Sequence, residues 1–212
     1  MQLTDFLLRL TESEIRIDDA YVDYSTTTFD SIATRSTLSL PISKLVLYPS
    51  DLEMFYPPLN RLSDSMIVGG DVQGSLPAVN LNDFYVIYGR ALSLDANAYL
   101  EDYGSWQSSP LAVNIAQLLI DTRSITRITQ QLAQGGAMSP IELPVNTDYV
   151  NLKALLKGIL PDLQINLNLL TPSGDLALNG TGGYVYSSGD AHVDATLTTQ
   201  NINLAQLLAN PV

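Results

Sequence analysis

Most of the chain consists of segments in which hydrophobic and polar residues alternate. The clearest segment is 191–198, whose hydrophobic members are Ala191, Val193, Ala195 and Leu197. Successive side chains of a strand point to opposite faces, so this alternation predicts strands with one apolar and one polar face. Further strands are predicted at 13–24, 32–40, 45–47, 66–72, 81–88, 91–100 and 111–120, and on either side of a hairpin at 171–175. We therefore predict a mainly β fold, in which antiparallel, meandering strands form an elongated curved sheet or half-open groove.

Short amphipathic helices are predicted between these strands. Residues 2–11 carry Leu3, Phe6, Leu7 and Leu10 at helical spacing, with Thr4 as a plausible cap. Helical turns are also predicted at 51–56 and 204–208, and a helix of about three turns at 123–134. Pro41 predicts a strand end or an edge strand, because proline cannot donate to a ladder.

A nine-residue phrase occurs twice and indicates internal repetition. Residues 74–82 and 158–166 share glycine, any residue, Leu-Pro, and then aliphatic residues at alternate positions before Asn. Each copy leads into a strand, a glycine-containing hairpin and another strand. We expect three units: an incomplete N-terminal β unit with short helices at 1–62, a central β-meander plus helix at 63–145, and a second β-meander ending in a short helix at 146–212.

Composition narrows the range of partners. Hydrophobic residues make up 46% of the 212 residues, which excludes a disordered segment, and charged residues only 15%. The net charge of −12 repels phosphate backbones, so nucleic-acid binding is disfavoured. The chain contains no cysteine, which removes disulfides and thiolate chemistry. No run approaches the roughly 20 apolar residues that span a bilayer, and the N-terminus lacks a signal-peptide pattern.

Residues suited to catalysis or metal binding are sparse and scattered. His192 occupies a polar strand position, and no second histidine or cysteine is available to share a metal with it. The glycines of 180–183 predict a turn, since the Lys-Ser/Thr of a phosphate loop is missing. Two glycosidase carboxylates can lie far apart in sequence, so that reading stays open. We predict no catalytic residue, no metal and no cofactor, and hence no enzyme.

Three phrases resemble a known superfamily. Gly-Asp-Val-Gln-Gly-Ser-Leu stands at 70–76, Leu-Ala-Gln-Leu-Leu at 204–208, and a strand with a Thr-x-x-Gly hairpin at 158–174. Together they resemble the TamB and AsmA-like superfamily of Gram-negative envelope proteins, most specifically over 65–209. The block 13–60 departs from the pattern, being shorter and more irregular. The resemblance implies a periplasmic segment of a longer protein that is anchored in the inner membrane by a part outside this chain.

The resemblance also implies a function in lipid transport or outer-membrane assembly. In that superfamily an apolar groove is thought to conduct lipid between the two membranes. The expected partners are lipids or acyl chains and, through other parts of the parent chain, an outer-membrane β-barrel assembly protein. The candidate groove residues, which could equally form a sealed core, are Leu92, Leu94, Ala96, Ala98, Leu163, Ile165, Leu167, Leu176, Leu178, Val193, Ala195 and Leu197.

The aromatic residues support an alternative hypothesis. The chain has eleven tyrosines and one tryptophan, and its polar positions are mostly uncharged. A secreted or surface β-sandwich that binds glycans or acts as an adhesin would use such residues. This alternative predicts a closed sandwich with exposed aromatic side chains around Tyr99, Tyr103 and Trp106.

Overall fold

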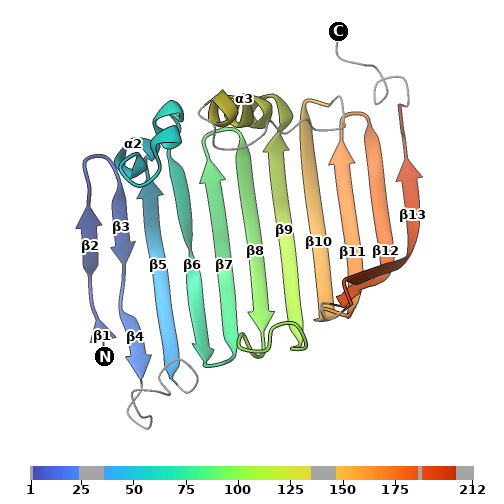
Figure 1. Cartoon of the computed structure of the whole chain (residues 1–212), viewed down its shortest axis with the longest axis horizontal. Helices are drawn as coiled ribbons and strands as arrows, with labels where there is room; N and C mark the ends of the chain where they lie inside the picture. The colour runs from blue at the N-terminus through green and yellow to red at the C-terminus, as the bar shows by residue number, and fades with distance from the viewer. Residues whose placement is uncertain (1, 24–35, 135–146, 186–187, 204–212) are drawn as a thin grey trace.

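The fold is a single open antiparallel sheet of meandering strands (Figure 1). The computed structural model describes residues 2–23, 36–134, 147–185 and 188–203. Within these residues thirteen strands belong to one sheet, and from β5 to β13 each strand pairs with the next along the chain. The mainly β, meandering architecture predicted from the alternation is confirmed.

The strands are of similar length over most of the sheet, and the helices are few. The strands are β1 (Gln2–Leu3), β2 (Phe6–Arg9), β3 (Glu14–Ile17), β4 (Ala20–Asp23), β5 (Thr37–Leu47), β6 (Met66–Ser75), β7 (Val79–Tyr88), β8 (Leu92–Leu100), β9 (Leu111–Asp121), β10 (Tyr149–Ile159), β11 (Asp162–Thr171), β12 (Gly174–Val185) and β13 (Asp190–Gln200). The helices are α2 (Pro49–Leu52), the 3₁₀ helix η2 (Pro57–Arg61) and α3 (Thr122–Gln134). The three expected units are thus parts of one continuous sheet, joined through the β5–β6 and β9–β10 pairings.

The N-terminal segment is a hairpin, and the helix predicted for residues 2–11 was wrong. β2 pairs with β3, so that Phe6 lies opposite Ile17 and Leu8 opposite Ile15. The hairpin is interrupted at Asp5 and Asp19, which have positive φ angles of 49° and 32°. A helix this short is marginal by itself, whereas the hairpin extends a sheet already formed by β5. Long-range pairing therefore overrides the local helical spacing.

Two further predictions from the sequence were wrong, because they depended on which strands lie beside the residue concerned. Pro41 does not end its strand: β5 continues to Leu47, with Pro41 opposite Asp71 of β6. On the other side of β5, β3 pairs with residues 44–46 and β4 pairs with residues 37–39. Pro41 lies between these two segments and is paired with neither strand. The glycines of 180–183 lie inside β12 rather than in a turn. A Cβ on Gly183 would lie 2.0 Å from the Pro161 carbonyl oxygen, so close approach of backbone requires this glycine.

The repeated phrase occupies the same structural position in both copies. Its first glycine is the last residue but one of β6 or β10, just before the hairpin to β7 or β11. A Cβ on Gly74 would lie 2.1 Å from the Ala78 carbonyl oxygen, and one on Gly158 would lie 2.4 Å from that of Asp162. In each copy the chain four residues later passes directly over the glycine, which leaves no room for a side chain.

The helix predicted at 123–134 is confirmed as α3, which lies along one edge of the sheet across the strand ends (Figure 1). Asp121 caps its first turn, because the Ser124 backbone N–H donates to Asp121 Oδ1 at 2.6 Å. The helical turn at 51–56 is realised in part by α2. The turn predicted at 204–208 lies outside the described residues.

Replacing Asp121 with alanine should remove this cap and lower the free energy of unfolding by about 1 kcal/mol at pH 7. Hydrogen bonds from the backbone and hydroxyl of Ser124 lower the pKa of the Asp121 carboxyl, although desolvation opposes them. This contribution is therefore present above the ordinary carboxyl pKa and is lost as the pH falls through the lowered value, below about pH 4.

Thermal and denaturant unfolding between pH 7 and pH 2.5 measure the difference. Asp121→Asn is the matched control, because asparagine caps a helix without titrating, so the cap's contribution should lose its acid dependence. An Asp121→Ala variant as stable as the wild type at pH 7 would show that the cap contributes nothing.

The sheet has almost no sealed hydrophobic core. Among the described residues, the buried hydrophobic side chains are only Ala20, Ala91 and Ala154. The large aliphatic side chains are half-buried or exposed. In a single layer of strands, these side chains are therefore shielded from water only by neighbouring side chains on the same face of the sheet.

Candidate functional site: the apolar face

One face of the sheet is built from rows of aliphatic side chains that cross neighbouring strands. Residues opposite each other in paired strands carry their side chains on the same face. One such row comprises Val86, Leu94, Leu118, Leu152, Leu169 and Leu176. A second comprises Leu81, Ala98, Val113, Leu156, Ile165, Gly180 and Ala195. We call the face that carries these rows the apolar face.

All twelve candidate groove residues lie on the apolar face. Leu92, Leu94, Ala96 and Ala98 come from β8, and each faces a partner in β9: Ile120, Leu118, Ile115 and Val113. The candidates of β11 continue the same rows into β12 and β13, for example from Leu167 to Leu178 and then Leu197. Val193 and Leu197 on the last described strand are 68% and 60% exposed. The register thus joins residues that are up to about a hundred positions apart into one surface.

About half of this surface was not predicted from the sequence, mainly on β7, β9 and β10. Their contributions include Val79, Leu81, Phe84, Val86, Leu111, Val113, Ile115, Leu118, Ile120, Val150, Leu152, Ala154 and Leu156. In β7 and β9 a bulge shifts the alternation by one residue, between Leu81 and Phe84 and between Ile115 and Leu118. A spacing of three between aliphatic residues inside an alternating segment is the signal that could have located them.

Within the described part of the chain, no second layer covers the apolar face. All its strands belong to one sheet, and α2, η2 and α3 lie along one edge (Figure 1). A covering layer would bury the leucines, yet only three alanines are buried hydrophobic residues there. The closed sandwich of the alternative hypothesis is therefore wrong as a description of this fold.

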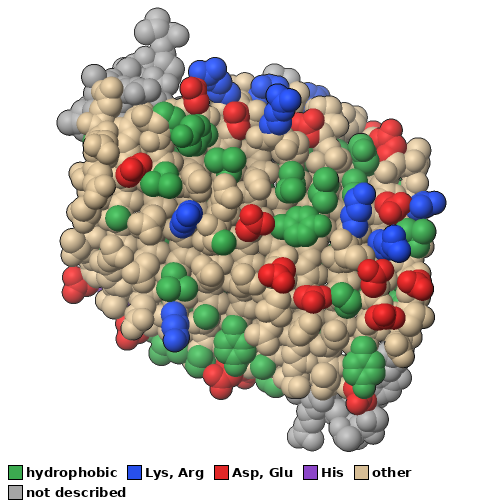
Figure 2. All heavy atoms as spheres, turned by 180° about the vertical axis from the view of Figure 1, so that it is seen from behind, with side chains coloured by type: hydrophobic (Ala, Val, Ile, Leu, Met, Phe, Trp, Pro, Cys, Tyr) green, Lys and Arg blue, Asp and Glu red, His purple; other side chains and the backbone are tan. Residues whose placement is uncertain are grey.

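The opposite face is polar and mostly uncharged. Its rows pair Asp95 with Gln117, Asn97 with Asn114, and Asn166 with Asn179. Figure 2 shows the molecule from behind: charged side chains and isolated hydrophobic ones are scattered among uncharged polar side chains and backbone. The two faces therefore differ strongly in chemistry, and water solvates the polar face well.

The apolar face is hollowed where β7, β8 and β9 meet the loop between β8 and β9. The hollow has a volume of about 390 Å³, and the residues around it include Leu81, Ala98, Leu100, Tyr103, Trp106 and Val113. Tyr103 and Trp106 are 37% and 41% exposed. The loop thus places two aromatic rings beside the aliphatic rows, and the lining is almost wholly apolar.

Hydrogen bonds hold that loop in place. The Gly104 backbone N–H donates to Asp102 Oδ1 at 2.8 Å, and the Ser105 hydroxyl donates to the same carboxylate. The hydroxyl of Ser105 and the N–H of Gly104 lower the pKa of the Asp102 carboxyl. The Tyr103 N–H donates to the Pro77 carbonyl at 3.2 Å, which links the loop to the β6–β7 turn. These hydrogen bonds fix the backbone of the loop that carries the two aromatic residues.

The chain matches no protein-family model and no curated protein, and its structure matches no solved structure. No helix in the described ranges has the length and hydropathy needed to cross a membrane. Over the same ranges, His, Cys, Asp and Glu form no group of three or more that could hold a metal ion. His192 is exposed on β13. The geometry defines an open, single-layer β protein with one exposed apolar face.

Proposed function

We propose that this chain holds the acyl chains of lipids along its apolar face, as a non-enzymatic segment of a TamB-like or AsmA-like protein in lipid transport or outer-membrane assembly. The observation that carries the proposal is the aliphatic surface that runs across the strands without a covering layer of described residues. Large exposed apolar patches on proteins mark interaction sites. The proposed location is the periplasm, where such a segment would bridge part of the distance between two membranes.

The chemistry of the face suits a ligand without hydrogen-bonding groups. The two rows described above consist of Leu, Val, Ile, Ala and Gly, which offer no side-chain donor or acceptor. Removing apolar area from water is favourable by about 25 cal/mol per Å² and has no directional requirement. An acyl chain can therefore bind at many positions along the rows, which is what a conduit needs and a specific receptor does not.

Chemical extraction tests the proposal directly. The purified chain is extracted with organic solvent, and the extract is examined by mass spectrometry for fatty acids and phospholipids. We expect acyl lipids to co-purify, and a fluorescent fatty acid to bind the delipidated protein. A lipid-free extract together with no binding of the fluorescent fatty acid would overturn the proposal.

Trp106 provides a second measurement, because it is the only tryptophan and it borders the apolar hollow. Binding of a fatty acid should move its emission to shorter wavelength, and a brominated fatty acid should quench it, since the ring leaves water for hydrocarbon. In the Trp106→Phe control the signal disappears while the fluorescent fatty acid still binds.

The same titration distinguishes lipid binding from glycan binding, the alternative that the exposed Tyr99, Tyr103 and Trp106 favour. An emission change with soluble oligosaccharides but none with fatty acids would support a glycan-binding module and count against the lipid proposal. Unchanged emission while the fatty acid demonstrably binds would place the acyl chain elsewhere on the face.

A further inference from the structure

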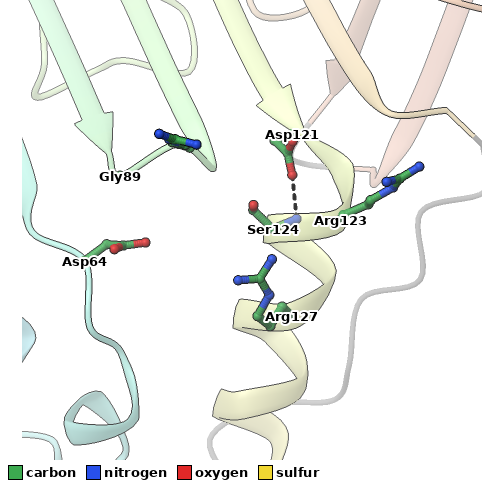
Figure 3. Close-up of a pocket in the computed structure, with 7 residues that line it drawn as sticks. Asp64, Gly89, Asp121, Arg123, Ser124 and Arg127 are labelled. Atoms are coloured by element: carbon green, nitrogen blue, oxygen red, sulfur yellow. Dashed lines mark hydrogen bonds between the residues drawn. The ribbon is translucent and has the colours of Figure 1, made fainter.

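A second hollow lies at the helix-bearing edge of the sheet, and its lining is charged (Figure 3). It has a volume of about 450 Å³ and lies between the β7–β8 turn, the end of β9 and the first turns of α3. Its charged and hydroxyl-bearing lining residues are Asp64, Arg90, Asp121, Arg123, Ser124 and Arg127. Three of the ten basic residues of an otherwise acidic chain thus gather around one hollow.

Some of these groups already have partners. Asp121 accepts the Ser124 backbone N–H and so occupies the N-terminus of α3. Arg123 is paired with Asp148, and Figure 3 shows its side chain directed away from Asp64. Arg90 and Arg127 form no ion pair with any other described residue. The charge of Arg127 also helps to lower the pKa of the Asp121 carboxyl. The hollow therefore presents the guanidinium groups of Arg90 and Arg127 beside the carboxylates of Asp64 and Asp121.

The charged hollow adjoins the end of the apolar face. Tyr88, Leu92 and Ile120 form the last row of that face at this edge. Gly89 follows Tyr88 directly, and it lines the charged hollow. A Cβ built on Gly89 would lie 2.6 Å from Asp64 Oδ2, so this carboxylate lies directly beside the β7–β8 turn. A ligand lying along the apolar face can therefore reach the hollow with its terminal group.

Guanidinium groups suit phosphate and carboxylate ligands. The planar fork of arginine donates two parallel hydrogen bonds to such anions, and it stays charged at all relevant pH values. The volume of the hollow, about 450 Å³, falls within the range of roughly 300–1,000 Å³ that is typical of small-molecule sites, so it admits an anionic group of this kind.

We propose that Arg90 and Arg127 bind the phosphate or carboxylate headgroup of an anionic amphiphile whose acyl chain lies on the apolar face. The inference rests on the proposed function, since it gives a binding site to the headgroup of the same lipid whose acyl chain lies on the apolar face. With this headgroup site, the protein prefers anionic lipids over neutral ones. The site also orients the lipid, with the headgroup at the edge of the sheet that carries α3.

Two soluble lipids with identical short chains test this inference: dihexanoyl phosphatidic acid, which is anionic, and dihexanoyl glycerol, which is neutral. Calorimetric titration of the wild-type protein should show the anionic lipid binding about tenfold more tightly. The double variant Arg90→Gln/Arg127→Gln should lose this preference and retain its affinity for the neutral lipid. The matched control, Lys153→Gln/Lys157→Gln, removes the same charge from exposed sites on β10 and should keep the preference.

The possible outcomes separate the two proposals. Failure of both lipids to bind would overturn the proposed function. Equal binding of both lipids to the wild type, or a preference that survives the double substitution, would overturn the headgroup site alone. Titration with inorganic phosphate distinguishes the source of the anion: if phosphate by itself binds as tightly as phosphatidic acid, the hollow is a site for free phosphate and the amphiphile is excluded.

Discussion

Replacing Leu156 with aspartate is expected to weaken fatty-acid binding by about tenfold or more, whereas the same change at Leu155 leaves binding unchanged. The two residues are neighbours on β10 but face opposite ways. Leu156 lies opposite Val113 and Ile165 in a row of the apolar face. An acyl chain bound there would cover the new carboxylate and remove it from water, which is unfavourable for a charge without a partner.

Leu155 provides the matched control. It lies opposite Asn114 and Asn166 on the polar face, and it is 45% exposed. Both variants are titrated with a fluorescent fatty acid, and circular dichroism verifies that each remains folded. Leu156→Ser serves as a milder substitution at the same position and should also weaken binding. Wild-type affinity in both Leu156 variants, with the fold intact, would show that the apolar face is not where the ligand lies.

The second large effect concerns the repeated glycine. Gly74→Ala and Gly158→Ala should each lower the free energy of unfolding by about 3 kcal/mol, because the added methyl would collide with a backbone carbonyl and the hairpin would have to shift. The distances from the added Cβ to that oxygen are 2.1 Å for Gly74 and 2.4 Å for Gly158. Gly158 also has a φ of +136°, which an alanine rarely adopts.

Urea unfolding followed by circular dichroism measures these changes. Gly104→Ala is the control, because a Cβ there would lie 3.2 Å from the side-chain Oδ1 of Asp102 and would meet no backbone atom of a residue distant in sequence. We expect that variant to stay within about 1 kcal/mol of the wild type. Equal stability of all three variants would mean that the hairpins relax around the methyl group and that the repeat carries no packing constraint.

The local alternation predicted much of the apolar face correctly. In β8, β11, β12 and β13 the side chains keep strict period two, so the twelve candidate residues could be assigned to one face of their strands. In β7 and β9 a bulge changes the phase, and a reading based on strict alternation loses half of each strand. The N-terminal hairpin was missed because four residues at helical spacing also fit a strand once a partner is present.

The charged hollow could not be predicted from the sequence. Arg90 follows a hairpin turn, Arg127 lies on α3, and Asp64 precedes β6, so nothing in their spacing suggests a common site. Their proximity depends on the antiparallel pairing of β7, β8 and β9, which brings the β7–β8 turn to the edge where β9 ends. Long-range pairing therefore creates the site.

By itself, the sequence determined the β class of this protein, most of the regular strands, the apolar sides of β8, β11, β12 and β13, and helix α3. These features follow from the geometry of a few consecutive residues. Only the tertiary structure decided that the strands form one open layer and that the aliphatic rows stay uncovered among the described residues. The reason is that alternating side chains are equally compatible with a sealed sandwich and with an open sheet. The covering of a face is decided by which segments, distant in sequence, pack against it.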